Sequence, residues 1–479
     1  MTSDHTDTVP VVSFREAFRT WCRVAALSFG GSAGQIAVMH RIVVDEKRWL
    51  SEARFLHALN YCMLLPGPEA QQLATYIGWL MHGVRGGLVA GTLFILPGFF
   101  SILVLSVLYA EYQQTTLVAA LFFGLKPAVM AIVVEAVIRI GKRVLKNRGY
   151  VAVAGLSFAA ITLGVPFPVL VLSAGVIGLV GGRVWPELFS GGAEQGTTVA
   201  ATRTENADAE VGLGPSPRPS PPNHASTGIG AAPGGEGAMG ASLWRRSLIV
   251  SAVCLTLWFG PLAALWFNFG SDSVYVQEGI FFSKAAMVTF GGAYAALAYV
   301  AQQAIERHGW LQPGEMLDGL GMAETTPGPL IIVVQFVGFL GAYRQPGPLS
   351  PIAGGVLGSV VTVWATFAPC FLWIFLGAPY VERLRGNRAM NSALSAITAA
   401  VVGVVLNLAV WFSIHTLFRT VVTIGRGALT VEVPVVSSFD WRTGSVALLA
   451  FALTFVAGRG MAVTLSVCVL AGAALYTLT

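Results

Sequence analysis

Apolar runs close to the length of a membrane-spanning helix recur along almost the whole chain. The first three cover Arg23 to Met39, Leu88 to Ala110 and Thr115 to Ile138. A helix needs about 20 such residues to cross the hydrocarbon core of a bilayer. Of the 479 residues, 55% are hydrophobic and 11% are charged, against roughly 45–50% and 25% in soluble domains. The pattern predicts an all-α polytopic integral membrane protein.

One segment interrupts this pattern and divides the chain. From about Pro186 to Ser242 the composition shifts to Gly, Pro, Ser, Thr and Ala with few large apolar residues, which predicts a disordered linker. The first residues carry Asp4 and Asp7 and no basic run, so we expect no cleaved signal peptide. The predicted parts are an N-terminal tail (1–13), a first membrane repeat (14–185), the linker (186–243), a connecting transmembrane helix (244–270) and a second membrane repeat (271–479).

The two membrane repeats are related by a fixed offset. The features that recur 261 residues later are Gly30-Gly31 as Gly291-Gly292, Trp49-Leu50 as Trp310-Leu311, and Pro66-Gly67-Pro68 as Pro327-Gly328-Pro329. Farther along, "LPGFF" at 96–100 matches "APCFL" at 368–372 with an offset of 272. The insertion therefore falls in the loop after the Pro-Gly-Pro segment. Several features at one offset indicate a duplicated sequence.

We count about six crossings in each half and one extra helix, about thirteen in all. The predicted crossings lie near 20–39, 54–83, 88–110, 115–138, 150–164 and 165–182, then 247–268 for the extra helix, then 276–300, 317–343, 352–377, 391–415, 444–457 and 460–477. An even count followed by one extra helix starts the second half from the opposite side of the membrane. The repeats are therefore predicted to be inverted, with the N-terminus and the linker in the cytoplasm.

The positions of basic residues support this topology, with one exception. The clusters that fall on one side are Arg15, Arg19 and Arg23, then Arg139, Lys142, Arg143, Lys146 and Arg148, then Arg383, Arg385 and Arg388. Positive charge marks the cytoplasmic side. The loop from Arg41 to Arg54, with four basic residues, falls on the wrong side. A re-entrant Pro-Gly-Pro hairpin, with the N-terminus outside, would correct that loop, but would strand Arg383 to Arg388 outside and make the repeats parallel. We therefore favour a crossing.

The Pro-Gly-Pro segments are the first candidate binding elements. Helices broken inside a membrane occur where they are buried in protein or line a cavity, and in transporters their N-terminal ends point at anionic groups. Pro68 and Pro329 suit the start of such a half-helix, whose free N–H groups can bind an anion. We expect Pro66, Gly67 and Pro68 to face Pro327, Gly328 and Pro329 across one site. The alternative is an ordinary helix kink.

The paired glycines offer further donors. Gly30 and Gly31, with Gly291 and Gly292, follow a phenylalanine in each half. Glycine lets the backbone approach a ligand closely, although small-residue helix packing explains such pairs equally well. Their recurrence at the repeat offset favours a binding role.

Charged residues within apolar runs mark further candidates, because a charge in the bilayer is costly. Lys126 lies in the middle of one run and is predicted to bind an anion, or alternatively to pair with a carboxylate elsewhere in the fold. Glu135 lies nine residues later and is expected to pair with Arg139 at i+4. Glu69 and Glu324 flank the two breaks. Glu69 is either a carboxylate that satisfies the helix dipole or a protonation switch that competes with the anion, and Glu324 is a candidate for the same coupling.

Other kinds of chemistry find little support. The five cysteines and seven histidines show no disulfide or metal-ligand spacing, and no nucleotide-binding or nucleophile motif is present. We therefore expect no metal, no cofactor and no enzyme activity. The net charge of +5 is explained by loop residues under the positive-inside rule, so no nucleic-acid partner is expected; the expected surroundings are the lipid bilayer.

The chain resembles the chromate ion transporter (CHR) family in its long-chain, two-domain form. The stretches that carry the resemblance are "FGGSAGQIAVMHR", "LLPGPEAQQLATYIGWLMHGVRGGLVAG", "LFFGLKPAVMAIVVEA", "VTFGGAYAALAYVAQQ", "GEMLDGLGMAETTPGPLIIVVQFVGFLGAYR", "FAPCFLWIFLGAPYVERLRGN" and "SAITAAVVGVVLNLAV". With their flanks they cover nearly everything outside the linker and the extreme ends. Ser32 departs from the proline that many members carry after the double glycine.

The resemblance implies an inner-membrane carrier that exports chromate and confers resistance to it. Sulfate, a dianion of the same shape, is the expected competitor, and a sulfate or general oxyanion transporter is the alternative reading. An integral-membrane enzyme such as a chromate reductase, or a channel, would be a different class of protein. The oligomeric state is left open, with a homodimer as one option.

Overall fold

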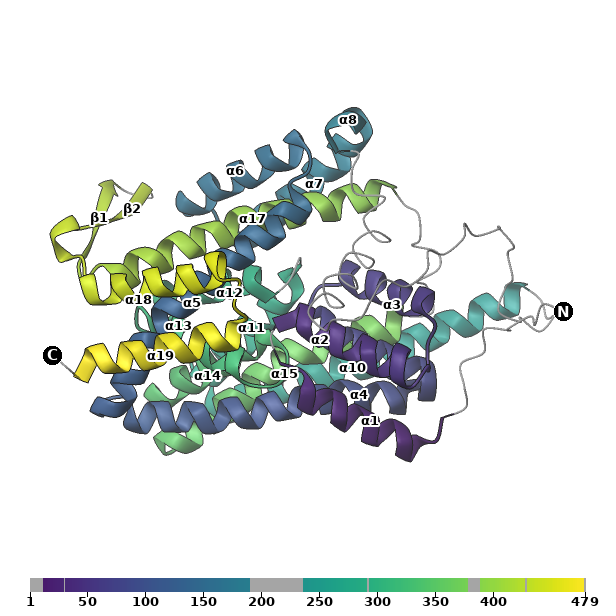
Figure 1. The fold of residues 1–479 in the computed structure, drawn as a ribbon. Coiled ribbons are helices and arrows are strands. Elements are labelled where there is room, and N and C mark those ends of the chain that lie inside the picture. Colours follow the sequence, from purple (N-terminus) through teal and green to yellow (C-terminus); the bar gives the residue numbers. More distant parts are fainter. Residues whose placement is uncertain are drawn as a thin grey trace.

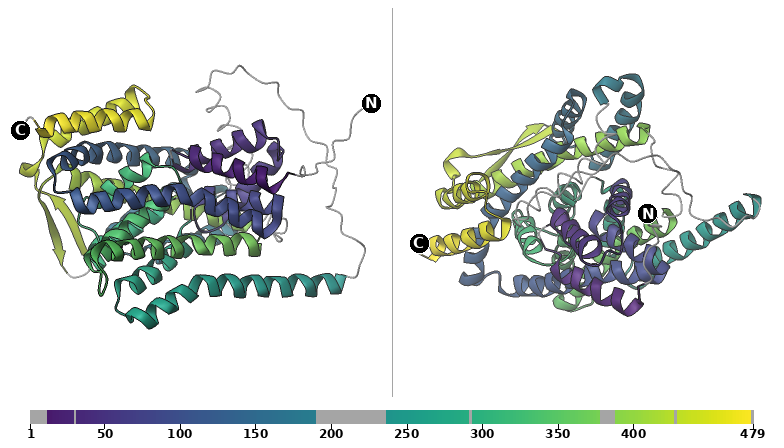
Figure 2. Two further views of the ribbon diagram at one scale, coloured as in Figure 1. Left: turned by 90° about the horizontal axis from the view of Figure 1, so that it is seen from below. Right: turned by 45° about the vertical axis from the view of Figure 1, so that its right-hand side comes forward.

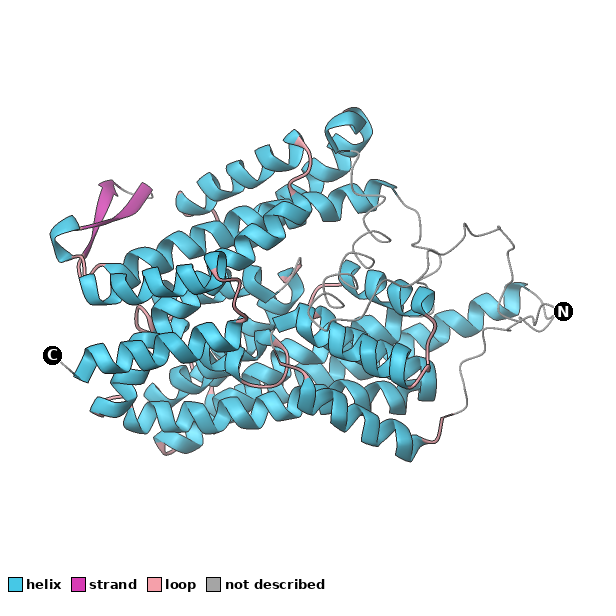
Figure 3. Cartoon of the chain, viewed as in Figure 1, coloured by secondary structure: helices cyan, strands magenta, loops and turns pink. Residues whose placement is uncertain are grey.

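The computed structural model describes residues 12–29, 31–189, 236–290, 293–377, 388–426 and 429–477. Gly30, Gly291, Gly292 and most of the predicted linker lie outside these residues. The described chain is a bundle of helices with one small β-hairpin (Figures 1 and 3), which agrees with the predicted all-α class except at that hairpin.

The helices follow the same order in the two halves. The first half holds α1 (Phe14–Leu27), α2 (Gly31–His40), η1 (Arg41–Glu46), α3 (Glu52–Leu64), α4 (Glu69–Tyr112), α5 (Thr116–Val144), α6 (Arg148–Thr162), α7 (Phe167–Val184) and α8 (Pro186–Phe189). The second half holds α11 (Val274–Val288), α12 (Ala293–Gln302), η2 (Gln303–Arg307), α13 (Glu315–Thr325), η3 (Leu330–Ile332), α14 (Val333–Arg344), α15 (Pro351–Gly377), α17 (Arg388–Leu417), α18 (Trp441–Phe451), η6 (Ala452–Val456) and α19 (Met461–Thr477).

Two further features lie outside this shared order. The helix α10 (Glu236–Phe269) connects the halves and begins earlier than the predicted connecting helix, while α8 occupies the first residues of the predicted linker. The antiparallel strands β1 (Val421–Arg426) and β2 (Leu429–Pro434), followed by η5 (Val436–Ser438), were not predicted from the sequence.

The long helix α4 is two antiparallel helices joined by a tight turn. His82 and Gly83 leave the helical conformation, and Gly83 has φ +60°, a region that glycine enters without strain. Beyond the turn the chain returns along itself, so that a Cβ placed on Gly78 would lie 2.4 Å from the carbonyl oxygen of Gly86. Small residues permit this close packing. The matching pair in the second half is α14 and α15, where the loop 345–350 makes the turn.

Both interrupted segments of the first half fold back as hairpins. Glu16, near the start of α1, lies 2.9 Å from the Nζ of Lys47, which follows η1, so the chain reverses between α1 and α2 and the two helices run antiparallel. The rings of Tyr61 in α3 and Tyr76 in α4 have centroids 5.3 Å apart. This contact requires antiparallel arms with Pro66-Gly67-Pro68 at the turn.

The second half repeats this arrangement. The ring of Phe281 in α11 lies 5.5 Å from that of Tyr299 in α12. Glu315, the first residue of α13, lies 2.6 Å from a guanidinium nitrogen of Arg344, the last residue of α14. Each half therefore begins with two helical hairpins. The second hairpin turns at the Pro-Gly-Pro segment, and the first reverses between α1 and α2 in one half and between α11 and α12 in the other.

These hairpins correct the predicted topology. The segments expected to form single crossings at 20–39 and 54–83, and their counterparts at 276–300 and 317–343, do not form single straight helices, because each segment reverses direction at its turn. The physical reason is the turn itself: Gly67 and Gly328 have φ of +124° and +108°, which redirect the chain rather than kink it. The count of about thirteen crossings is not confirmed.

The turns of one half bind the turns of the other. The N–H of Gly67 donates to the carbonyl of Thr289 at 2.8 Å, and the N–H of Gly328 donates to the carbonyl of Ser28 at 2.9 Å. Both the donors and the acceptors are 261 residues apart, so the two bonds are counterparts. In Figure 1 the hairpins of the first half (purple) meet helices of the second half (teal) in the middle of the molecule.

The later helices exchange partners between the halves. The helix α5 packs against α18 and α19 of the second half, and α17 packs against α6 and α7 of the first. Glycines make these contacts close: a Cβ on Gly124 would lie 2.3 Å from the carbonyl oxygen of Cys468, and one on Gly403 would lie 2.2 Å from that of Ala154. The two halves therefore share one buried core.

Six helices are long and apolar enough to cross a membrane, counted over the described residues. They are Glu69–Tyr112, Thr116–Val144, Phe167–Val184, Arg245–Phe269, Pro351–Gly377 and Asn391–Leu417. Shorter apolar helices occur at Arg148–Thr162, Leu330–Arg344, Trp441–Val456 and Met461–Thr477. The helix α10 lies along one side of the bundle (Figure 2, left) and exposes Leu248, Val253 and Phe267, as expected of a helix that faces lipid.

Candidate functional site

The hairpin turns place several helix N-termini together. The second arm of every hairpin starts at its turn, so α2, α4, α12 and η3 all begin there. Pro68 and Pro329 precede α4 and η3, and no side chain caps either helix. The first N–H groups of these helices are therefore available to an external acceptor. Together with the positive end of each helix dipole, they favour an anion.

Glycine at the turns is required by contacts as well as by backbone angles. A Cβ on Gly328 would lie 3.0 Å from the Cα of Gly98 in α4, and one on Gly67 would lie 2.9 Å from the Sγ of Cys370 in α15. Gly98 and Cys370 are counterparts at the second repeat offset. Each Pro-Gly-Pro turn thus rests on the long helix of the opposite half.

Buried amide side chains fasten the turns. Gln35 donates to the carbonyl of Gly328, and Gln72 donates to that of Pro66 at 2.7 Å. Gln335 donates to the carbonyl of Phe99 at 2.9 Å, next to the glycine that supports the turn. The carbonyl oxygens of these three amides are buried, and no described residue hydrogen-bonds to them. Unpaired buried polar atoms mark places where a further partner is expected.

The two glutamates at the breaks have different environments. Glu324 is 4% exposed and accepts a 2.6 Å hydrogen bond from the hydroxyl of Tyr294, which joins α13 to α12 beside the turns. Its second oxygen, Oε2, has no hydrogen-bond partner in the part of the chain that the structure describes. Glu69 is half-buried at the first residue of α4, and no contact of its carboxylate is defined within the described part of the chain. Both the helix-dipole and the switch interpretation of Glu69 stay open.

The structure does not bring Lys126 to the turns. Its Nζ lies 3.3 Å from Oδ2 of Asp318 on α13, nine residues before Pro327, or about 13 Å along a helix axis. The alternative that the sequence left open, a carboxylate partner from elsewhere in the fold, is therefore what the structure shows. Asp318 also accepts a 2.9 Å hydrogen bond from the hydroxyl of Tyr109 in α4.

The predicted pair of Glu135 and Arg139 forms as an i,i+4 ion pair on α5. Both charges act on Glu324, so this pair lies on the side of α5 that faces the turns of the second half. Four residues later, Arg143 contacts the sulfur of Met63 in α3 at 3.9 Å. The end of α5 thus presents basic side chains next to two hairpins.

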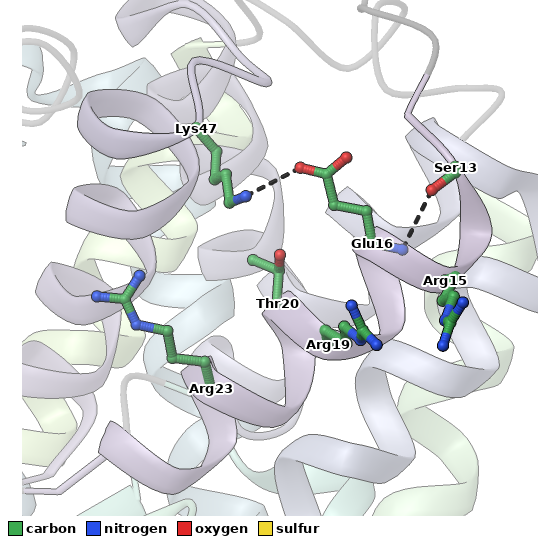
Figure 4. Close-up of a pocket in the computed structure, with 7 residues that line it drawn as sticks. All are labelled: Ser13, Arg15, Glu16, Arg19, Thr20, Arg23 and Lys47. Atoms are coloured by element: carbon green, nitrogen blue, oxygen red, sulfur yellow. Dashed lines mark hydrogen bonds and ion pairs between the residues drawn. The ribbon is translucent and has the colours of Figure 1, made fainter.

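A basic surface lies at the base of the first hairpin, away from the turns. A cavity of about 490 Å³ there is lined by Ser13, Arg15, Glu16, Arg19, Thr20, Arg23 and Lys47. Glu16 pairs with Lys47, and Figure 4 shows Arg15 and Arg19 pointing away from that pair. Arg23 pairs with Glu46. Positive charge in excess at one face raises the local concentration of anions.

Several residues near the turns were not predicted from the sequence. Ser28 and Thr289 accept the hydrogen bonds of the turns with their backbone carbonyls, so their side chains give no signal in the sequence. A signal was present for three others: Gln35 and Gln72 are amides in apolar surroundings, and Asp318 is an acidic residue near the second break. Gly31, Gly67 and Gly328 have positive φ and lie at hairpin turns, where the sequence predicted breaks within crossing helices. Gly30, Gly291 and Gly292 lie outside the described residues. Within the described residues, no group of three or more His, Cys, Asp or Glu side chains could hold a metal ion.

The fold and these turns define a polytopic α-helical membrane protein in which broken hairpins from two halves of the chain meet. Helix breaks of this kind form the binding sites of many membrane transport proteins. The family described as "Chromate transporter" matches residues 15–179 and 276–477, which is most of the chain outside the linker. The protein belongs to the chromate transporter family.

Individual relatives agree with this assignment. The chain is 30% identical over 401 residues to a chromate transport protein of Pseudomonas aeruginosa, covering 83% of this chain and 80% of the relative. It is 26% identical to a chromate transport protein of Cupriavidus metallidurans, covering 83% and 82%. It is 25% identical to a probable chromate transport protein of Synechococcus elongatus, covering 83% and 84%. No solved structure matches the chain.

Proposed function

We propose that this protein exports chromate across the bacterial inner membrane by alternating access, with the hairpin turns as the oxyanion site. The observation that carries the proposal is the reciprocal pairing of Gly67 with Thr289 and of Gly328 with Ser28. It joins uncapped helix ends from both halves in one place. Backbone N–H groups and helix dipoles can replace the hydration of a tetrahedral dianion without a dedicated cation.

We further propose that the repeats are inverted. Each half enters and leaves its two hairpins on one side and then crosses with four helices: α4 from Val84, α5, α6 and α7 in the first half, and α15, α17, α18 with η6, and α19 in the second. The single helix α10 then reverses the second half relative to the first. The two interrupted segments of each half become hairpins and no longer count as crossings. Each half then has four crossings, which is still an even number.

The distribution of charge supports this arrangement. With two hairpins in each half, the loop 41–54 and Arg85 join the N-terminal arginines and the basic end of α5 on one side. Arg383 and Arg385, which lie outside the described residues, follow α15 and fall on that side as well. The loop that contradicted the sequence-based topology now obeys the positive-inside rule, and we assign this side to the cytoplasm.

Membrane potential is sufficient to drive export in this scheme. Moving a dianion out of a negative-inside cell is favoured by about 4.6 kcal/mol per 100 mV, twice the value for one charge. The basic cavity at the base of the first hairpin and the arginines of α5 lie on the cytoplasmic side in this topology. They would concentrate the anion where it is taken up. Rocking of one set of hairpins against the other would then expose the turns to the outside.

A general oxyanion transporter, with sulfate as a substrate, is the second candidate. It is favoured by the nature of the turns, whose donors are backbone N–H groups and amides. Such donors recognise shape and charge and do not distinguish one tetrahedral dianion from another.

Transport by purified protein in liposomes tests the proposal. We expect saturable chromate movement that accelerates when the chromate-containing side is made electrically negative, and that unlabelled sulfate inhibits if the second candidate holds. The potential and the pH gradient are set independently, and protein-free liposomes provide the control. An absence of chromate movement would refute the proposal, whereas flux without saturation or counterflow would indicate a channel.

A further inference from the structure

A buried carboxylate outside the turns is incompletely satisfied. Asp318 on α13 is 1% exposed. Its Oδ2 lies 3.3 Å from the Nζ of Lys126 on α5 and accepts a 2.9 Å hydrogen bond from Tyr109 on α4. Its Oδ1 has no hydrogen-bond partner among the described residues. A carboxylate of the second half is therefore held by two side chains of the first.

The other charged groups around Asp318 are already engaged. The elements that pack most closely against α13 are α4, α5, α14 and η3, and α12 also contacts it through Tyr294, which donates to Glu324. On α13 itself, Glu315 pairs with Arg344 of α14 at 2.6 Å, and Arg344 also donates to the carbonyl of Trp310 at 2.7 Å. At the ends of α14 and α4, Tyr343 donates to Glu111. The residues of η3 are apolar, and Glu135 and Arg139 of α5 pair with each other near Glu324. Lys126 is therefore the cation that faces Asp318.

The two partners differ in how far their side chains are exposed. The side chain of Lys126 is 34% exposed, whereas that of Asp318 is 2% exposed. An anion that arrives from the exposed side meets the ammonium group first. If it takes Lys126 as its partner, the buried carboxylate loses the cation that compensates its charge, and an uncompensated buried charge is strongly unfavourable. Binding of one proton to Asp318 removes that charge and leaves Lys126 free.

We propose that Asp318 is a proton-coupling residue: it binds one proton when Lys126 binds the oxyanion and releases it when the Lys126–Asp318 pair re-forms. The inference rests on the proposed oxyanion transport and deepens it by adding a second anion position, about one hairpin arm away from the turns. No covalent bond changes, and the charge balance is one dianion for one proton. Each cycle then moves one net negative charge, so acidification of the outside opposes export.

Binding of potassium chromate to the purified full-length protein tests this inference. The measurements are the dissociation constant and the proton uptake, made over the alkaline range in which chromate remains a dianion. For the wild type we expect the dissociation constant to rise by about tenfold per pH unit, with uptake of about one proton per chromate bound. Binding without proton uptake by the wild type overturns the inference, whatever the variants do.

Variants test whether the coupled proton binds to Asp318 or to another group. Asp318→Asn mimics the protonated residue, so we expect chromate binding that no longer depends on pH and takes up no proton. Lys126→Gln should lose the pH-dependent binding at this second position and keep binding at the turns. The matched control is Glu111→Gln, a carboxylate at the exposed end of α4, which should keep the wild-type pH slope. A wild-type slope in Asp318→Asn would overturn the inference.

The rival carboxylate is Glu278 on α11, which is fully buried with neither oxygen hydrogen-bonded. If Glu278→Gln abolishes the pH slope and Asp318→Asn keeps it, the coupling belongs to Glu278 and the inference fails. Failure of the proposed function has a different signature. In that case the wild type neither binds nor transports chromate at any pH.

Discussion

Single glycines determine how closely the hairpin turns approach the rest of the protein. Gly328 has φ +108°, and its Cα faces the backbone of Gly98, so neither the conformation nor the space allows a side chain. Gly67 has the same requirement against Cys370. Other glycines with positive φ, such as Gly347, face open space. The same residue type therefore serves two purposes, and only contacts distinguish them.

This difference predicts the effect of Gly328→Ala. We expect it to destabilise the protein by about 2–4 kcal/mol, because a strained backbone and a clash with backbone atoms add together, and to reduce chromate transport at least about tenfold through a displaced turn. The matched control, Gly347→Ala, has a positive φ but no clash and should cost about 1–2 kcal/mol with transport retained. Thermal unfolding and liposome transport measure both effects, and equal losses in the two variants would contradict the argument.

At the scale of elements, ion pairs clamp the hairpins at their bases while glycines shape their turns. Arg344 holds Glu315 through two nitrogens at 2.6 and 2.9 Å, and the Glu315 side chain is only 8% exposed. This pair joins the first residue of α13 to the last of α14. The pair between Arg419 and Asp440, by comparison, joins two loop residues, and its arginine side chain is 69% exposed.

The two pairs predict different costs. Arg344→Ala leaves a buried carboxylate unpaired and should destabilise the protein by about 3–5 kcal/mol. Replacing both partners, as Arg344→Met with Glu315→Leu, should recover most of that loss because no charge stays buried. Arg419→Ala should cost at most about 1 kcal/mol. Unfolding of the purified variants measures these differences, and a similar cost for Arg344→Ala and Arg419→Ala would argue against a clamp.

At the scale of the whole molecule, the two halves are not separable domains. The helix α5 packs on α18 and α19, α17 packs on α6 and α7, and the turns bind across the halves. Neither half can bury its own apolar surface without the other. Relative movement is therefore expected between the hairpins of one half and those of the other, on this shared scaffold, and not between two complete halves.

The proposed topology predicts which loops share a face of the membrane. In a variant without native cysteines, single cysteines at Arg48 and Arg85 should react with an impermeant reagent from the cytoplasmic side. Cysteines at Glu306 and Ser350 should react from the opposite side. All four positions are exposed: Arg48 and Ser350 lie in loops, Arg85 follows the turn inside α4, and Glu306 lies in η2. Reactivity therefore reports on the side and not on burial. Labelling of Arg48 and Arg85 from opposite sides would restore the crossing topology and contradict the hairpins.

Some features of this protein depend only on the local sequence, and others depend on the packing of distant segments. The apolar runs, the linker, the repeat offset and the importance of the Pro-Gly-Pro and Phe-Gly-Gly segments follow from the sequence, because each depends on local composition or on recurrence along the chain. The i,i+4 pair of Glu135 and Arg139 is predictable for the same reason, since helical spacing brings the two residues together. The direction of the chain after each break is not local. A Pro-Gly-Pro segment permits a kink as well as a reversal, and packing of the following arm selects between them.

The partner of Lys126 and the pairing of the turns were decided by the tertiary structure alone. Asp318 lies 192 residues after Lys126, and Gly67 meets Thr289 across a similar separation, so no pattern in the sequence links them. The sequence by itself determined a duplicated, polytopic helical membrane protein with two kinds of helix break. Only the tertiary structure decided that the breaks are hairpin turns that bind each other, because hydrogen bonds and buried charges depend on distance in space.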